Sequence, residues 1–384
     1  MKGLLKKALS SRGKLFLYFL IIIVPFMTYP LSINGITIHP RKIREVCFYS
    51  FAIVICSFLQ KSKWLRYLII WCLLNWWLNF FMPNESYVIL TNILSALIIY
   101  IGMKKLVEIG FLKIDIILRI ICLMALFQFS WVTMQAFNID PIFYPVTATG
   151  APYLAAKMPL CGWSGNPVLL SSFFACSVFL FLHYFKINNR PLLFFLISFP
   201  ILFLRSATVA ISFTAGGLFY LVNRYKFSRK TLWAGLTMAM FLILFFIFVK
   251  HPNTDRWLIW KRLIVDGIKI RPLVGTGLSM FSRLMIIDKR TATQWFEAHN
   301  DYLQMILELG TIGFILFSGF IISRFIKFFK SEKNNKQICI MSCLVAFLVS
   351  ATSLFPMHIA QLSFIAIILL VTLEQSYEVK ILQS

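Results

Sequence analysis

The stretch Glu297–Gly313, EAHNDYLQMILELGTIG, places the only His-Asn pair of the chain directly before a long apolar run. His299 and Asn300 are followed by nine residues, then by Gly310, two further residues and Gly313. Apolar runs of about 20 residues predict membrane-spanning helices, and this run continues beyond the second glycine. We therefore expect polar chemistry to meet a bilayer at this point of the chain.

The composition of the whole chain is that of a membrane protein. Of its 384 residues 59% are hydrophobic and only 14% are charged, whereas about 25% are charged in soluble domains. The 38 basic and 14 acidic residues give a net charge of +24. Basic residues accumulate in the cytoplasmic loops of membrane proteins, and no basic stretch belongs to a recognisable nucleic-acid-binding module. Nucleic acid is therefore not an expected partner.

The apolar segments predict an all-α polytopic membrane protein with about 12 transmembrane helices, forming a single integral membrane domain over residues 1–384. With the N-terminus in the cytoplasm, strict alternation places most of the basic loops on the cytoplasmic side, as the positive-inside rule requires. The expected spans are 15–31, 46–60, 67–82, 87–103, 114–137, 167–185, 191–204, 207–223, 231–249, 303–323, 338–355 and 358–374.

One long outer loop, predicted over residues 250–302, separates the ninth and tenth of these spans. Within it, residues 255–270 have apolar side chains at helical spacing, and Trp257 and Trp260 suit a short helix that lies at the membrane interface. The sequence Gly275–Gly277, GTG, predicts a tight turn after this helix.

Two arginines are candidates for a functional role. Arg205 lies in FLRSATVA between two apolar runs, where a guanidinium is costly unless it is paired or faces a wet cavity. The alternative is an arginine that reaches the lipid headgroups as a topological anchor. Arg256 lies in TDRWLIWKR beside two tryptophans, and it is either a site residue or a headgroup contact of the interfacial helix.

His299 is the strongest single candidate, because a neutral imidazole can accept a proton near neutral pH. Asn300 beside it can orient a substrate or a ring nitrogen. The alternative for His299 is a helix cap or a headgroup contact.

Gly310 and Gly313 are spaced so that another helix can approach closely, and the acidic Glu308 within the same span can pair with a buried arginine. No HxH, HExxH or DxD motif is present, so neither a metal nor a cofactor is expected.

Together these residues resemble the O-antigen ligase and O-antigen polymerase superfamily, whose characteristic motif is H-[NSQ]-x9-G-x-x-G at the end of a long periplasmic loop. His299, Asn300, Gly310 and Gly313 fit this motif without a gap.

Three further segments are similar to parts of the family pattern. LRSATVA around Arg205 resembles the S-R segment between two spans, although Leu204 stands where the family usually has Ser. DRWLIW around Arg256, followed by GTG, resembles an R-x3-W segment that leads to G-x-G. The GNP at 165–167 resembles a Gly-Asn-Pro that opens a middle span.

The resemblance implies a multi-pass glycosyltransferase of the bacterial inner membrane, with its active site facing the periplasm. Members transfer a glycan from a polyprenyl diphosphate carrier, typically undecaprenyl diphosphate, to an acceptor. By resemblance, Arg205 and Arg256 would grip the diphosphate, His299 would position or deprotonate the acceptor hydroxyl, and Asn300 would help to hold the substrate. Without a carboxylate that stands out as a nucleophile, direct attack with inversion is expected.

Three functions remain open at this point. The regular His-Asn motif favours a ligase of lipopolysaccharide biosynthesis, whose acceptor is lipid A-core. A polymerase of O-antigen or another surface polysaccharide would use the same donor and the next repeat unit as acceptor. From a different class, a flippase of lipid-linked glycans also has many spans, but its intramembrane charges would be spread along several helices.

Overall fold

The structure, a computed structural model, describes residues 31–33, 36–38, 67–75 apart from 69 and 73, 100–136 apart from 111, 167–185, 207–225, 254–278, 281, 298–354, 356–358 and 360–381. Nearly all of these residues are helical, which confirms the all-α class. The helices are α6 (Ile114–Ala136), α7 (Pro167–Tyr184), α10 (Ala207–Arg224), α12 (Thr254–Arg262), the π-helix η3 (Leu263–Ile268), α14 (Asp301–Lys330), α15 (Asn335–Ser350), the 3-10 helix η4 (Pro356–His358) and α16 (Ala360–Ile381).

A small hairpin departs from the all-helical prediction. Strands β1 (Leu31–Ile33) and β2 (Ile36–Ile38) pair antiparallel, with Ile33 opposite Ile36. The two residues between them in the sequence are Asn34 and Gly35, and Asn-Gly between β-branched residues is a strong signal for a two-residue hairpin. The hydropathy pattern alone did not reveal it.

Two helices of the described part of the chain are long and apolar enough to cross a membrane, Ile114–Gln135 and Asp301–Lys330. The other long helices, α7, α10, α15 and α16, also lie where spans were expected. The number of twelve spans stays a prediction, because 46–60, 191–204, 231–249, nearly all of 15–31 and much of 67–82 and 87–103 lie outside the described residues.

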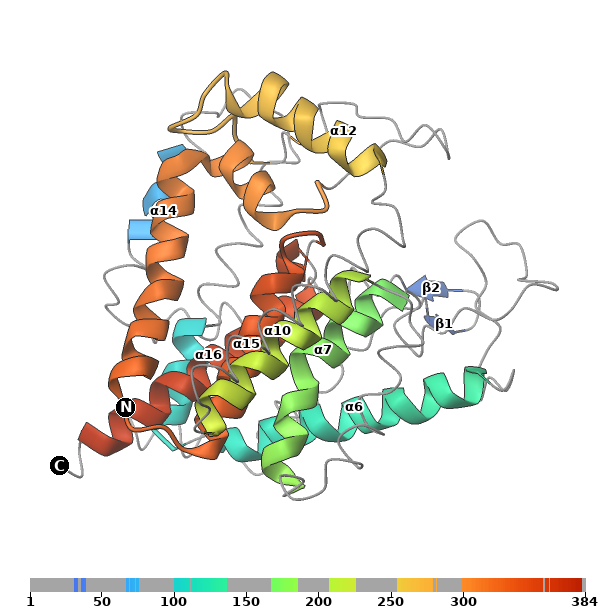
Figure 1. The fold of residues 1–384 in the computed structure, drawn as a ribbon, viewed down its shortest axis with the longest axis vertical. Coiled ribbons are helices and arrows are strands. Elements are labelled where there is room, and N and C mark those ends of the chain that lie inside the picture. Colours follow the sequence, from blue (N-terminus) through green and yellow to red (C-terminus); the bar gives the residue numbers. More distant parts are fainter. Residues whose placement is uncertain are drawn as a thin grey trace.

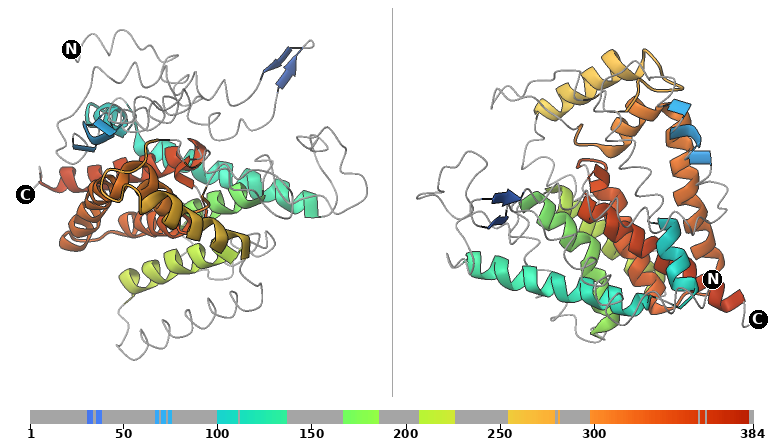
Figure 2. Two further views of the ribbon diagram at one scale, coloured as in Figure 1. Left: turned by 90° about the horizontal axis from the view of Figure 1, so that it is seen from above. Right: turned by 180° about the vertical axis from the view of Figure 1, so that it is seen from behind.

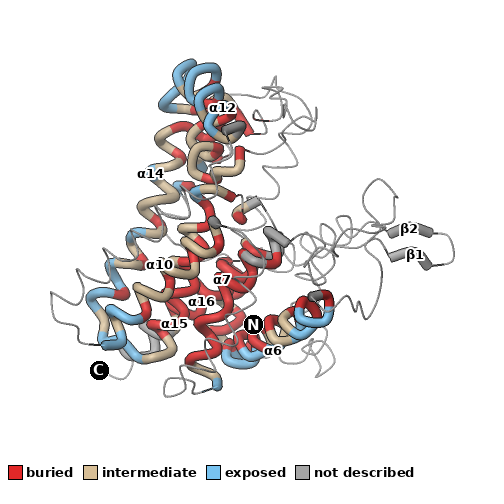
Figure 3. Tube along the Cα trace, turned by 45° about the vertical axis from the view of Figure 1, so that its right-hand side comes forward, coloured by how far each residue is buried: buried red, intermediate tan, exposed pale blue. Residues whose placement is uncertain are grey.

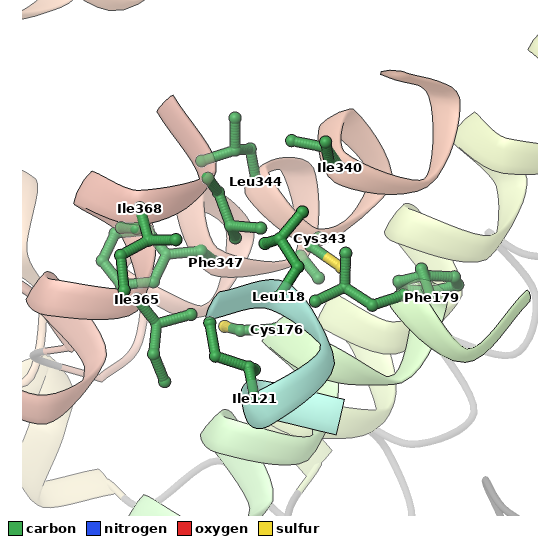
Figure 4. Packing of buried hydrophobic residues seen from close by; sticks show 14 of the residues in the cluster. Leu118, Ile121, Cys176, Phe179, Ile340, Cys343, Leu344, Phe347, Ile365 and Ile368 are labelled. Atoms are coloured by element: carbon green, nitrogen blue, oxygen red, sulfur yellow. The ribbon is translucent and has the colours of Figure 1, made fainter. Parts of the chain in front are cut away.

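The main core is formed by α6, α7, α10, α15 and α16, which lie together in Figure 1. In Figure 3, α7, α15 and α16 are largely buried, whereas α6 and α10 are buried along one face only. Helix α15 is central, because it packs against α7, α10 and α16. Figure 4 shows Cys176 and Cys343 among aliphatic and aromatic side chains. Both thiols are fully buried, so these cysteines act as small apolar core residues.

Helix α12 crosses the end of α14 that begins at Asp301, well away from the C-terminal end of α16 (Figures 1 and 2). The predicted helix over 255–270 is confirmed as α12 and η3 together. Its inner face buries Ile259 and Leu263 against Phe281 and Leu307. Trp257 on the other face is 61% exposed.

Helix α14 is broken at Gly310, which has φ 71° and ψ 179°. The loop after η3 fills the break. Thr276 N–H donates to Leu307 O at 2.8 Å, and Thr311 N–H donates to Pro272 O at 2.9 Å. Backbone groups that an unbroken helix would pair internally are thus paired with the loop.

At the other end of α14, a buried ionic cluster joins three segments. Arg324 of α14 forms a salt bridge with Glu374 of α16 and donates a hydrogen bond to the hydroxyl of Tyr100 at 3.1 Å. Lys104 Nζ lies 3.1 Å from the second carboxylate oxygen of Glu374. Each of these charges therefore has an opposite charge beside it, which buried ions require.

Candidate active site at the start of helix α14

His299 lies in the turn directly before α14, and its backbone is unusual. Its φ is 52°, in the left-handed region, which costs a residue other than glycine about 1–3 kcal/mol. Asn300 follows with an extended backbone and caps the helix, because its Oδ1 accepts a hydrogen bond from Leu303 N at 3.0 Å. The structure thus gives the capping role to Asn300 and leaves the imidazole of His299 outside the helix.

The turn that carries His299 is fixed to the segment after α15. Asp301 is buried, its N–H donates to Ala351 O at 2.9 Å, and its carboxylate accepts from Met357 N at 2.8 Å. The hydroxyl of Tyr302 donates to Leu348 O at 2.7 Å. The start of α14 therefore has a defined place on the core helices.

Arg256 reaches the same segment from α12. Its Nη1 donates to Ser353 O at 2.9 Å, and the hydroxyl of Ser353 donates to Thr208 Oγ1 at 2.7 Å. Thr208 belongs to the first turn of α10. Three separate parts of the chain, α10, α12 and the turn after α15, therefore meet at Ser353.

Arg256 lies near enough to His299 for its positive charge to act on the imidazole. Burial lowers the pKa of His299 to about 4, and the positive charge of Arg256 acts in the same direction. The imidazole is therefore neutral at pH 7. Burial also lowers the pKa of Arg256, but a guanidinium remains protonated at neutral pH. The arrangement offers a neutral proton acceptor next to a fixed positive charge.

Arg256 still has hydrogen-bonding capacity. Within the described part of the chain, its Nε is buried and has no hydrogen-bond partner. Buried polar atoms are nearly always paired, so an orphaned guanidinium N–H marks a place where an acceptor of a ligand can bind. Oxygen atoms of phosphate or carboxylate groups suit this donor best.

The structure brings together two of the three predicted catalytic residues, His299 and Arg256. Arg205 lies outside the described residues. Helix α10 begins two residues after it, at Ala207, and Thr208 of that helix hydrogen-bonds to Ser353. The part of the chain that directly follows Arg205 thus reaches the segment that Arg256 binds.

Of the two glycines of the motif, Gly310 departs from the predicted helix–helix contact, whereas Gly313 lies against Trp71 of another helical segment. Gly310 faces the loop at Leu273 and Gly275, and Gly313 faces the indole of Trp71. Glu308, which the sequence allowed to pair with a buried arginine, accepts a hydrogen bond from Gln304 Nε2 at 3.1 Å. The prediction that these positions allow close approach is right, but what approaches Gly310 is the backbone of a loop.

Gln304 and Asp301 were not predicted as site residues, although both are buried polar residues close to His299 in the sequence. A signal was available, because Gln304 and Glu308 are spaced i, i+4 within an apolar run and so share one face of the helix. In the described residues, no group of three or more His, Cys, Asp or Glu side chains could hold a metal ion.

Comparison with known families agrees with the motifs. Residues 191–318 match a family model described as O-Antigen ligase, and the match includes Arg205, Arg256, His299 and both glycines of the motif. The resemblance found in the sequence is therefore confirmed. The family consists of membrane-integral, glycosyltransferase-like enzymes of the ligase or polymerase type, and together with the apolar helices it indicates a membrane protein. No curated protein matches the chain.

Proposed function

Since residues 191–318 match the O-antigen ligase family, we propose that this protein is an O-antigen ligase-like glycosyltransferase. It moves a glycan from a polyprenyl diphosphate carrier to lipid A-core or a similar acceptor, at the periplasmic face of the inner membrane. The observation that supports this proposal best is the proximity of a neutral His299 to the half-buried Arg256 just outside α14.

Arg256 has the role of binding the diphosphate of the donor. The leaving group departs with growing negative charge, and a guanidinium in a low-dielectric site stabilises that charge through hydrogen bonds. Its Nη1 is held by Ser353 O, which fixes the side chain in place, while its Nε is available for a phosphate oxygen. Arg205 is proposed as the second guanidinium, because the helix that follows it reaches the same turn.

His299 acts on the acceptor. The acceptor oxygen attacks the anomeric carbon, the bond from that carbon to the phosphate oxygen breaks, and its electron pair leaves with the diphosphate. The proton of the acceptor hydroxyl passes to the imidazole of His299. A bound diphosphate offsets the charge of Arg256, so it raises the pKa of His299 and makes it a stronger base in the complex than in the free enzyme.

A polymerase is the alternative within the same family, because it would use the same donor and the same residues. The two functions differ only in the acceptor. Cells that lack a ligase accumulate lipid-linked polymer and carry bare lipid A-core, whereas cells that lack a polymerase carry a core with a single repeat unit. The deletion phenotype therefore separates them.

The proposal is tested with purified protein in proteoliposomes, supplied with a polyprenyl-diphosphate-linked glycan and lipid A-core. Wild-type protein is expected to release polyprenyl diphosphate and to form the new glycosidic bond. His299→Ala and Arg256→Gln are expected to lower the rate by about 100-fold or more. Lys261→Gln is a matched control, because Lys261 is an exposed cation of the same helix.

Two results would overturn the proposal. One is full transfer by His299→Ala protein that is made in normal amounts. The other is movement of the lipid-linked glycan across the bilayer without release of polyprenyl diphosphate, which would indicate a flippase.

A further inference from the structure

The left-handed backbone of His299 has to be held by its surroundings. The peptide before it belongs to Ala298, whose side chain is fully buried. The indole Nε1 of Trp260, on α12, donates to Ala298 O at 2.9 Å. The N–H of Ala298 donates to Gln304 Oε1 at 3.0 Å. Both polar groups of this residue are therefore fixed by side chains, one from α12 and one from α14.

Gln304 is itself fixed by a second side chain. Its Nε2 donates to Glu308 Oε1, one turn further along α14, at 3.1 Å. A glutamine amide has one accepting and one donating end. Because the carboxylate takes the donating end, the accepting oxygen is turned towards Ala298 N–H. Gln304 and Glu308 are 2% and 3% exposed, so water does not compete for these bonds.

We propose that Gln304, oriented by Glu308, is a positioning residue for the transfer reaction. It holds the Ala298 peptide against Trp260 and so fixes the turn that keeps the imidazole of His299 beside Arg256. This inference rests on the proposed function, because it assigns no chemistry to Gln304 itself and acts only through His299.

The direction of the hydrogen bonds gives a sharp test. Gln304→Glu retains an acceptor for Ala298 N–H but puts a second carboxylate against Glu308, so the pair loses its bond. The double variant Gln304→Glu/Glu308→Gln restores it in reverse, because the amide at 308 donates to the carboxylate at 304. The other oxygen of that carboxylate still accepts from Ala298 N–H. Charge and size are the same in the double variant as in the wild type.

We expect Gln304→Glu to lower kcat by about 10- to 100-fold with the KM for the lipid-linked donor within about twofold, because a displaced base slows the chemical step while the donor still binds. The double variant is expected to regain most of the lost kcat. Gln375→Glu, a glutamine of α16 outside this network, controls for an added carboxylate. The amount of monodisperse protein and its thermal unfolding midpoint are measured for each variant.

The inference is overturned if Gln304→Glu loses no more kcat than Gln375→Glu. It is also overturned if the double variant is folded but stays as slow as the single one, or if kcat falls only in proportion to the folded fraction. A failure of the proposed function is distinguishable from all of these outcomes, because the wild type itself would then release no polyprenyl diphosphate.

Discussion

The backbones of Gly275 and Gly310 approach each other so closely that neither residue has room for a side chain. A Cβ atom on Gly275 would lie 2.5 Å from both Glu308 O and Gly310 N, and a Cβ atom on Gly310 would lie 2.5 Å from Gly275 N. Both residues also have positive φ, of 76° and 71°. The G-x-G segment and the second half of the His-Asn motif are therefore two sides of one backbone junction.

Replacing either glycine of this junction by alanine is expected to destabilise the protein by more than about 3 kcal/mol, because strain at positive φ adds to a clash with backbone atoms that cannot rotate away. Gly110→Ala is the matched control. Gly110 has φ 72°, but a Cβ there meets nothing within 4 Å, so only the strain of about 1 kcal/mol remains. Thermal unfolding in detergent measures both. Equal midpoints for Gly310→Ala and Gly110→Ala would show that the close approach is unimportant.

Arg256→Lys keeps the positive charge but loses the planar fork of donors. Lys cannot hold Ser353 O and a phosphate oxygen in the same geometry, so kcat/KM for the donor is expected to fall by about 10- to 100-fold. Lys261→Arg, on the exposed face of the same helix, is expected to change kcat/KM by less than about twofold. Full activity of the Arg256→Lys protein would mean that a charge alone is enough.

The protonation of His299 gives a pH prediction. Its pKa is lowered to about 4 by burial and by Arg256, so the imidazole loses its proton well below the usual pH of about 6.5. In Arg256→Gln protein the positive charge is gone, so the pKa of His299 is expected to rise, but only part of the way, because burial is the larger cause and remains. Diethylpyrocarbonate reacts with the neutral imidazole, so peptide-level mass spectrometry across the pH range can follow the transition. Identical transitions in the wild type and Arg256→Gln would show that the charge of Arg256 does not act on His299.

Disrupting the ionic cluster at the other end of α14 is expected to lower the stability of the protein without changing glycan transfer. Glu374→Leu leaves the buried guanidinium of Arg324 without its carboxylate and removes the closer carboxylate of Lys104, and this is expected to cost about 3–5 kcal/mol. Glu108→Gln removes only a more exposed partner of the lysines and should cost less than about 1 kcal/mol. The unfolding midpoint measures the difference. Transfer per folded molecule is expected to be unchanged in both, since the cluster lies away from His299.

The sequence predicted those parts of the fold and site that depend on local patterns. The start of α14 at the His-Asn pair, the helix around Arg256 and the tight turn at Gly275–Gly277 follow from hydropathy, helix spacing and glycine content, and all three are present. The pairing of Arg256 with His299 came from the family resemblance, because no local pattern relates residues so far apart in the sequence.

Neither the break in α14 nor the contacts that fix the turn at His299 could be predicted from the sequence, and the reason is physical. A glycine pair within an apolar run is equally compatible with close helix packing, and only the loop that pairs with Leu307 and Thr311 makes the break favourable. The role of Gln304 likewise depends on Ala298 and Trp260 being brought to it by the fold. In both cases the deciding partner is remote or becomes apparent only in three dimensions.

The junction at Gly310 also has a consequence for how the protein is made. The ribosome completes the loop around Gly275 before it completes α14. The loop can therefore form its hydrogen bonds to α14 only after that helix has been synthesised. Until the two meet, carbonyl groups and N–H groups at the break have no partner, and hydrocarbon offers them none. The start of α14, which directly follows the turn that carries His299, is therefore complete only once the loop has packed against it.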